Sequence, residues 1–457
     1  MSRSAGAPAE GSLLRWGILA LLALAPLLVG AVHEPVFVPL LLGCGLAGVL
    51  AWRRSRAAVL AGREPPLPGA RWLVAALALV IFQLVPLPAP VLRLVNPGSY
   101  AFYDRLQLVP PLRGWHPISV SPPDTLRGLA FLAGFSLLYL AVFREMGAPP
   151  WPRRLLWTVA GTGLVMTLVA FAQAASSQPT RIYGLWKPRW DFAVFGPYVN
   201  RNHFAAYLVM ATLVALGLAL DALARLRERW QRRRRGYLAL GESAGMAFVR
   251  AGALVMVLVA GLFAAGSRGA IGAFAAAALA LPFFARHRGR TAAAVGALVA
   301  LGVSWIGVSG FLSAWHRGVR GSRLDLWADM LPMLPRAPVF GIGWNAFPTA
   351  YGYYQTVWRS DWVGAAHNEY LQVLLDTGLV GAVVFGALLA ITFRRASLTA
   401  RRGAVELGLL GALLGLALDN LVDFNWQIPA NAATFVALAG LACRPDGARE
   451  RAPGASP

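Results

Sequence analysis

The sequence is poor in charge. Of its 457 residues, 14% are Asp, Glu, Lys or Arg, whereas soluble domains carry about a quarter. Acidic side chains are scarcer than basic ones, 20 against 42, which gives a formal net charge of +22. In a soluble chain such an excess would indicate nucleic-acid binding. Here most arginines fall in short loops between apolar blocks, so no nucleic-acid partner is expected.

Cysteine is also scarce. Cys44 and Cys443 are the two cysteines, and both lie in apolar segments far apart in the chain, which excludes a disulfide framework and a thiolate metal site. The six histidines show no metal-ligand spacing. The stretch "GIGWNAF" contains Gly-x-Gly, but no predicted strand precedes it, as a dinucleotide site would require. We therefore expect neither a metal nor a cofactor.

Apolar residues are abundant and are grouped. Hydrophobic residues make up 57% of the chain and the mean hydropathy is +0.57. They form blocks of about twenty, the length of a helix that crosses the hydrocarbon core. The sequence predicts an all-α integral membrane protein with about twelve transmembrane helices. The predicted spans are 13–32, 36–51, 72–90, 125–143, 155–174, 203–222, 248–265, 270–285, 291–311, 369–393, 404–422 and 428–443.

The basic residues predict the orientation of these spans. If the N-terminus is cytoplasmic, 28 of the 42 Lys and Arg residues lie on the cytoplasmic side, as the positive-inside rule requires. Both termini are then cytoplasmic. A polytopic domain occupies 1–443 and includes a large outer loop over about 312–368, between the ninth and tenth spans. Residues 444–457 are predicted to form a disordered cytoplasmic tail.

Several arginines lie on the outer side, where the insertion rule does not place them. Arg201 lies in "YVNRNHFAAY", Arg268 in "AAGSRGAIGA" and Arg323 in "RGSRLDLW". An arginine buried at a membrane edge costs at least about 2.5–3.5 kcal/mol. A phosphate would compensate, because a guanidinium binds it through two parallel hydrogen bonds. The alternative is that these arginines contact lipid headgroups or pair with Asp419 and Asp423.

A histidine stands at the outer start of the tenth predicted span. His367, in "AHNEYL", can accept a proton near neutral pH, or it can simply cap the helix. Asn368, Gln372 and Asp376 follow at intervals of four, so they form one stripe that should face a cavity or neighbouring helices. His203, two residues after Arg201, is a weaker candidate.

Several of these segments together form a combination of motifs that is known from one protein family. The stretch from "GSRLDLWADMLPMLPRAPVFGIGWNAF" through "AHNEYLQVLLDTGLVGAVVF" contains four motifs in order: an Arg and a Trp, a Pro-x-x-Gly-x-Gly element, an aromatic loop and His-Asn-x-Tyr-Leu. This combination resembles the shared domain of the O-antigen ligase and O-antigen polymerase superfamily. The stretches "NRNHFAAYL" and "GSRGAIGAF" resemble upstream elements of that family. The resemblance covers about 198–443.

The resemblance implies a multi-span glycosyltransferase of the C-type architecture, which works at the periplasmic face of the bacterial inner membrane without a metal. The implied donor is a glycan on undecaprenyl diphosphate, and the implied acceptor is lipid A–core or another glycan. Arg201 and Arg268 would bind the diphosphate, with Arg323 as a third contact. His367 would take the acceptor proton, Asn368 would help to position it, and the anomeric carbon would be inverted.

Within the superfamily we favour an O-antigen ligase-like activity. An O-antigen or exopolysaccharide polymerase and a relative that transfers glycan to protein hydroxyls remain alternatives, because no residue specifies the acceptor. The alternative from a different class is a polysaccharide or lipid transporter or flippase. A transporter commonly places its polar residues near mid-membrane on broken helices, whereas here they gather at the outer edge.

Overall fold

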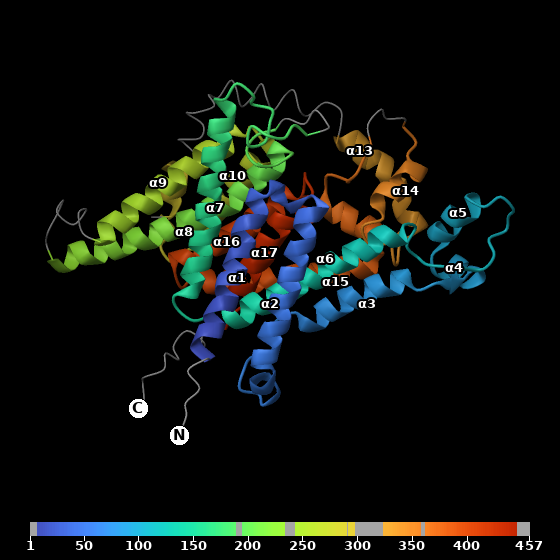
Figure 1. The fold of residues 1–457 in the computed structure, drawn as a ribbon, viewed down its shortest axis with the longest axis horizontal. Helices are drawn as coiled ribbons and strands as arrows, with labels where there is room; N and C mark the ends of the chain where they lie inside the picture. Colours follow the sequence, from blue (N-terminus) through green and yellow to red (C-terminus); the bar gives the residue numbers. More distant parts are fainter. Residues whose placement is uncertain are drawn as a thin grey trace.

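The computed structural model describes residues 7–188, 194–233, 243–289, 291–297, 323–357 and 362–445, and this part is dominated by helices (Figure 1). The elements of the first half are α1 (Ala7–Leu27), η1 (Val29–Ala31), α2 (Glu34–Leu60), α3 (Ala70–Leu84), β1 (Leu87–Pro88), α4 (Ala89–Val95), α5 (Pro97–Arg105), β2 (Trp115–His116), α6 (Pro122–Glu145) and α7 (Trp151–Ala174). The elements of the second half are α8 (Arg201–Arg233), α9 (Ser243–Ala264), α10 (Arg268–Phe284), α13 (Arg323–Met330), η3 (Leu331–Arg336), α14 (Phe347–Tyr354), α15 (Glu369–Ala400), α16 (Ala404–Asp419), η4 (Asn425–Gln427) and α17 (Pro429–Ala442).

Six helices in the described residues are long and apolar enough to cross a membrane: α2, α6, α7, α8, α9 and α15. Shorter apolar helices are found in α1, α3, α10 and α17. The fold is therefore that of an α-helical membrane protein, as predicted. The number twelve stays a prediction, since much of the predicted span 291–311, the start of the predicted loop 312–368 and most of the tail 444–457 lie outside the described residues.

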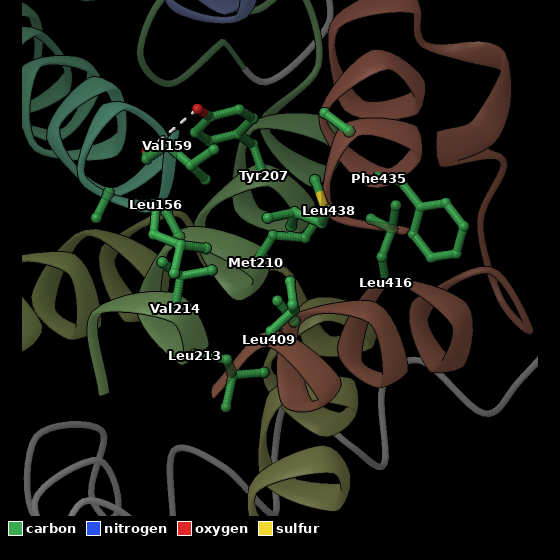
Figure 2. Packing of buried hydrophobic residues seen from close by; sticks show 14 of the residues in the cluster. Leu156, Val159, Tyr207, Met210, Leu213, Val214, Leu409, Leu416, Phe435 and Leu438 are labelled. Atoms are coloured by element: carbon green, nitrogen blue, oxygen red, sulfur yellow. Dashed lines mark hydrogen bonds between the residues drawn. The ribbon is translucent and has the colours of Figure 1, made fainter. Parts of the chain in front are cut away.

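Helix α8 forms the centre of the main core. It is buried along most of its length and packs against α7, α9, α10 and α16. Figure 2 shows Tyr207, Met210 and Leu213 of α8 among side chains of α7, α16 and α17. The hydroxyl of Tyr207 donates to the carbonyl of Val159 on α7 at 3.2 Å. Because this hydrogen bond satisfies a buried hydroxyl, the polar tip of the tyrosine is compatible with an apolar core.

Two glycines let α8 and α16 approach closely. A Cβ added at Gly217 would lie 2.8 Å from the Cα of Gly408, and one added at Gly408 would lie 2.6 Å from the Cα of Gly217. Small residues at a crossing of this kind are typical of packed membrane helices, where close contact of the backbones is the main source of attraction. This crossing joins the central helix to the C-terminal helices of the chain.

A second, smaller core lies at the end of the molecule that carries α4, α5, α13 and α14 (Figure 1). Phe102 of α5 packs there with Met330, Phe347 and Tyr351. The short strands β1 and β2 pair antiparallel, with Leu87 opposite His116, next to these helices. The third predicted span, 72–90, ends early at Leu84 because three prolines between residues 86 and 90 cannot continue a helix.

Helix α15 is interrupted at Gly378, whose backbone has φ 62° and ψ −164°. The segment around the Gly-x-Gly motif supplies hydrogen bonds to this interruption. Ile342 N donates to Leu375 O at 3.1 Å, and Leu379 N donates to Pro338 O at 2.9 Å. A broken helix at membrane depth requires such partners. The motif that does not fit a nucleotide site thus completes the hydrogen bonding of a broken helix.

Candidate functional site

Two of the three predicted anion-binding arginines share one local structure. Arg201 is the first residue of α8 and Arg268 is the first residue of α10, whereas Arg323 is the first described residue of α13. The unpaired N–H groups and the dipole of a helix N-terminus favour a negatively charged ligand, and a guanidinium at the same position adds a full positive charge. Arg201 and Arg268 are exposed and Arg323 is half-buried. The side chains of Arg201 and Arg268 are thus placed to reach a ligand from the starts of their helices.

Contacts between the elements show that the starts of α8 and α10 lie near one another. A Cβ added at Gly266, just before α10, would lie 3.7 Å from Nη1 of Arg201. A Cβ added at Gly269 would lie 3.1 Å from Oδ1 of Asp419, at the end of α16. The positive φ of 65° at Gly266 allows the tight turn between α9 and α10. The starts of α8 and α10 therefore meet the end of α16.

His367 lies beside a buried carboxylate. Its Nδ1 is 3.8 Å from Oδ1 of Asp423, and Nδ1 of His203 on α8 is 3.9 Å from the same oxygen. The ring of Phe424 contacts both imidazoles edge-on, with centroid distances of 4.7 and 4.9 Å. His367 also has a left-handed φ of 50°. Such backbone strain, of about 1–3 kcal/mol, often accompanies functional positions.

The charges around Asp423 are mutually compensating. Burial would raise the pKa of this carboxyl, but His203, His367 and Arg323 together hold the pKa below its usual value of 3.8. Asp423 is 3% exposed, so its charge acts in a poorly screened environment. Arg323 therefore acts on the same centre as the two histidines, although its helix follows α10 by a long stretch of chain.

A network of amides holds this centre in place. Nδ2 of Asn425 donates to Asp419 Oδ2 at 2.8 Å, and Oδ1 of Asn425 faces Nδ1 of His203 at 3.2 Å. Nδ2 of Asn431 donates to Asn425 Oδ1 at 3.0 Å and to the carbonyl of His203 at 2.9 Å. Tyr198 donates to the Oδ1 of Asn431 at 2.9 Å. The orientation of His203 is thus fixed from α16, η4 and α17.

The predicted polar stripe divides into a cap and a buried part. Asn368 is the N-cap of α15, since its Oδ1 accepts from Leu371 N at 3.0 Å. Gln372 and Asp376 are buried and line a cavity among α3, α6, α15 and α17. They therefore face protein, as the sequence predicts.

The structure thus brings Arg201, Arg268, Arg323 and His367 to one region, with Asn368 next to His367. Asn425, Asn431 and the pairing of Asp423 with two histidines are not predicted from the sequence, and His203 lies closer to this centre than its weaker sequence signal indicates. A signal was present: "LVDFNWQIPAN", residues 421–431, holds four polar side chains between two apolar helices. A polar cluster of this kind is costly in a membrane unless its members bind one another or a ligand.

Comparison with known proteins gives one match. Residues 253–386 match the family model described as O-Antigen ligase. This stretch contains Arg268, Arg323 and His367, whereas Arg201 and Asp423 lie outside it. No curated protein matches the chain. The family is one of glycosyltransferase-like membrane enzymes whose substrates are lipid-linked glycans. The resemblance read from the sequence is confirmed over residues 253–386, which match the O-antigen ligase family within a multi-pass membrane protein.

Proposed function

We propose that the protein transfers a glycan from undecaprenyl diphosphate to an acceptor hydroxyl at the periplasmic face of the bacterial inner membrane. The observation that carries the proposal is the convergence of arginines at helix N-termini with a histidine that faces a buried aspartate. A diphosphate requires cationic groups that stay charged, and a hydroxyl nucleophile requires a base. The two requirements are met by neighbouring residues.

In the proposed reaction, Arg201 and Arg268 bind the diphosphate and Arg323 is a third cationic contact. Nδ1 of His367 lies toward Asp423, so Nε2 is the ring nitrogen that accepts the proton of the acceptor hydroxyl. The acceptor oxygen forms a bond to the anomeric carbon while the bond from that carbon to the diphosphate oxygen breaks. The electron pair leaves with the diphosphate, whose charge the arginines stabilise, and the configuration inverts.

Asp423 would hold the His367 ring in this orientation and stabilise its protonated form, because a buried carboxylate favours a neighbouring imidazolium. The distance of 3.8 Å exceeds a hydrogen bond, but catalytic contacts often shorten when substrate binds. Asn368 is occupied as a helix cap through its Oδ1. It therefore positions His367 by fixing the start of α15, and its Nδ2 is the group left to contact the acceptor.

For the acceptor we favour lipid A–core, as in an O-antigen ligase, over a growing glycan on its carrier, as in a polymerase. The transporter alternative has one feature in its favour, the broken helix α15. However, the carbonyls of Leu375 and Asp376 at the break accept hydrogen bonds from Ile342 and Gly343. Carbonyls that are occupied by protein have little capacity to coordinate the ion that drives a secondary transporter, which favours the transferase.

The test uses the purified full chain in detergent with a lipid-diphosphate-linked oligosaccharide. Either lipid A–core or further carrier-linked repeat is supplied as acceptor, and product size and free undecaprenyl diphosphate are measured. His367→Asn removes the base while keeping a residue that tolerates the left-handed backbone. His116→Asn, at a histidine outside the cluster, is its control. Arg268→Ala tests the diphosphate contact, with Arg93→Ala on α4 as the matched outer arginine.

Transfer to lipid A–core that is lost in His367→Asn and Arg268→Ala, and kept in both controls, supports the ligase proposal. Growth of chains on the carrier, with the same dependence on the two residues, would replace the ligase by a polymerase that uses the same chemistry. Binding of the donor without reaction of either acceptor would contradict both the ligase and the polymerase, and would leave transfer to protein hydroxyls or the transporter.

A further inference from the structure

A cavity of about 290 Å³ lies among α3, α6, α15 and α17, apart from the arginine cluster. Much of its wall is apolar and aromatic, including Phe131, Phe135 and Phe385. The size is close to the lower end of small-molecule sites. Because the wall is built largely from apolar side chains of membrane helices, it matches the apolar chain of a lipid better than it matches a water-soluble ligand.

One part of the wall is polar and acidic. Glu369, Gln372 and Asp376 lie along one face of α15 and are each less than 5% exposed. Gln427 lines the same cavity and donates to Glu369 Oε2 at 3.2 Å. Among the described residues that line the cavity, no side chain is basic. A phosphate group would therefore meet carboxylates here without a compensating cation, which is unfavourable.

Two polar atoms of the lining residues have no partner in the described part of the chain. Oδ2 of Asp376 accepts from Asn345 N at 2.9 Å, but its Oδ1 is buried without a hydrogen bond. The indole Nε1 of Trp426 is also buried without one. A buried polar atom that nothing satisfies is unfavourable. Oδ1 of Asp376 needs a hydrogen-bond donor, and Nε1 of Trp426 needs an acceptor.

A hydroxyl can both donate and accept, so it satisfies both requirements. A cation would suit the carboxylates, but it would oppose the indole N–H and would leave the long apolar wall unused. We propose that this cavity binds a neutral glycolipid, with its apolar chain between α6 and α17 and its sugar hydroxyls at Asp376 and Trp426. This inference does not rest on the transfer reaction, since it concerns binding alone.

The experiment uses the full chain in phosphatidylcholine nanodiscs with a photoreactive probe. The probe is an alkyl glucoside that carries a diazirine on its chain, and an alkyl phosphate with the same chain is the comparison. Cross-linked positions are mapped by mass spectrometry, and competition with unlabelled alkyl glucoside gives the affinity. We expect saturable labelling of the cavity positions on α6 and α17 by the glucoside, and at least about tenfold less by the phosphate, since the lining lacks a cation.

Two pairs of variants make the test specific. Leu132→Trp fills the cavity from α6 and should abolish the labelling. Leu126→Trp on the same helix, at a side chain 60% exposed and outside the lining, should leave it unchanged. Trp426→Phe keeps the ring but removes the donor, so the glucoside should bind about 3- to 10-fold more weakly. Tyr370→Phe is its control, since this hydroxyl is already bonded to Ala417 O at 2.8 Å.

Three results would overturn the proposal. Labelling could spread over the lipid-facing helices without saturation, which would show that the probe marks only its partition into the membrane. The phosphate probe could label the cavity as well as the glucoside does, which would identify an anionic lipid as the ligand. An unchanged affinity in Trp426→Phe would show that the indole N–H does not contact the sugar.

Discussion

Replacement of Gly378 by alanine tests the account of the broken helix. The backbone at this position, with φ 62° and ψ −164°, lies in a region essentially restricted to glycine. A Cβ there would also lie 2.4 Å from the carbonyl carbon and oxygen of Val339, so the two backbones would have to separate. Separation weakens two hydrogen bonds, one from Leu379 N to Pro338 O and one from Val380 N to Val339 O. Strain and weakened hydrogen bonds together predict a loss of about 3–5 kcal/mol.

The matched control is Gly386→Ala on the same helix. Nothing lies within 4 Å of a Cβ added at Gly386, and alanine in a helix is more stable than glycine by about 0.5–1 kcal/mol. The measurement is the temperature at which each purified variant loses its monodisperse elution after heating in detergent. We expect a clear decrease for Gly378→Ala and no decrease for Gly386→Ala. Equal midpoints for the two variants would refute the reasoning from backbone conformation.

Three further predictions concern the site and the core. The pKa of Asp423 is lowered in the folded protein, so this carboxylate stabilises the fold above its usual value of 3.8 and loses that effect as pH falls through the folded value. Asp423→Asn should thus unfold at a lower temperature than wild type at neutral pH, and this difference in unfolding temperature should become smaller in acid. A difference that does not change with pH would contradict the pairing of Asp423 with the histidines. Arg268→Lys should weaken donor binding about tenfold or more, because a lysine cannot form the bidentate contact. Titration with the lipid diphosphate measures the affinity of each protein for the donor. Equal affinities in wild type and variant would show that Arg268 does not bind the diphosphate. Gly408→Leu should destabilise the protein by about 3 kcal/mol because α8 and α16 must separate. Gly252→Leu on α9 should not, because no atom lies within 4 Å of a Cβ added there. Thermal unfolding compares the two variants, and an equal effect would count against close packing at the crossing.

Much of the fold could be predicted because its signals are local. A block of about twenty apolar residues predicts a membrane helix by itself, and α6, α7 and α15 begin within a few residues of the predicted spans. The arginines and His367 could be selected because polar groups at a membrane edge are unusual. The interruption at Gly378 could not, because Asp376 just before it fits a polar stripe on one continuous helix and a glycine within a membrane helix is common.

The centre around Asp423 was harder to predict for a different reason. Asp423 and His203 are separated by a long stretch of chain, and no periodicity in either segment indicates that they meet. The choice between an arginine and a histidine as partner of Asp423 depends on how α8, α16 and η4 pack. The sequence shows which residues are costly to bury, whereas packing decides which of them compensate one another.

The carboxylate shared by His203 and His367 has a consequence for how substitutions at this centre combine. The two imidazoles face one oxygen, at 3.9 and 3.8 Å, so removing either ring changes the surroundings of the carboxylate that the other one faces. Residues that share a partner in this way do not contribute independently. The loss of activity in a variant that lacks both histidines should therefore differ from the product of the two single losses, and a double-mutant cycle would measure how strongly the two rings act through Asp423.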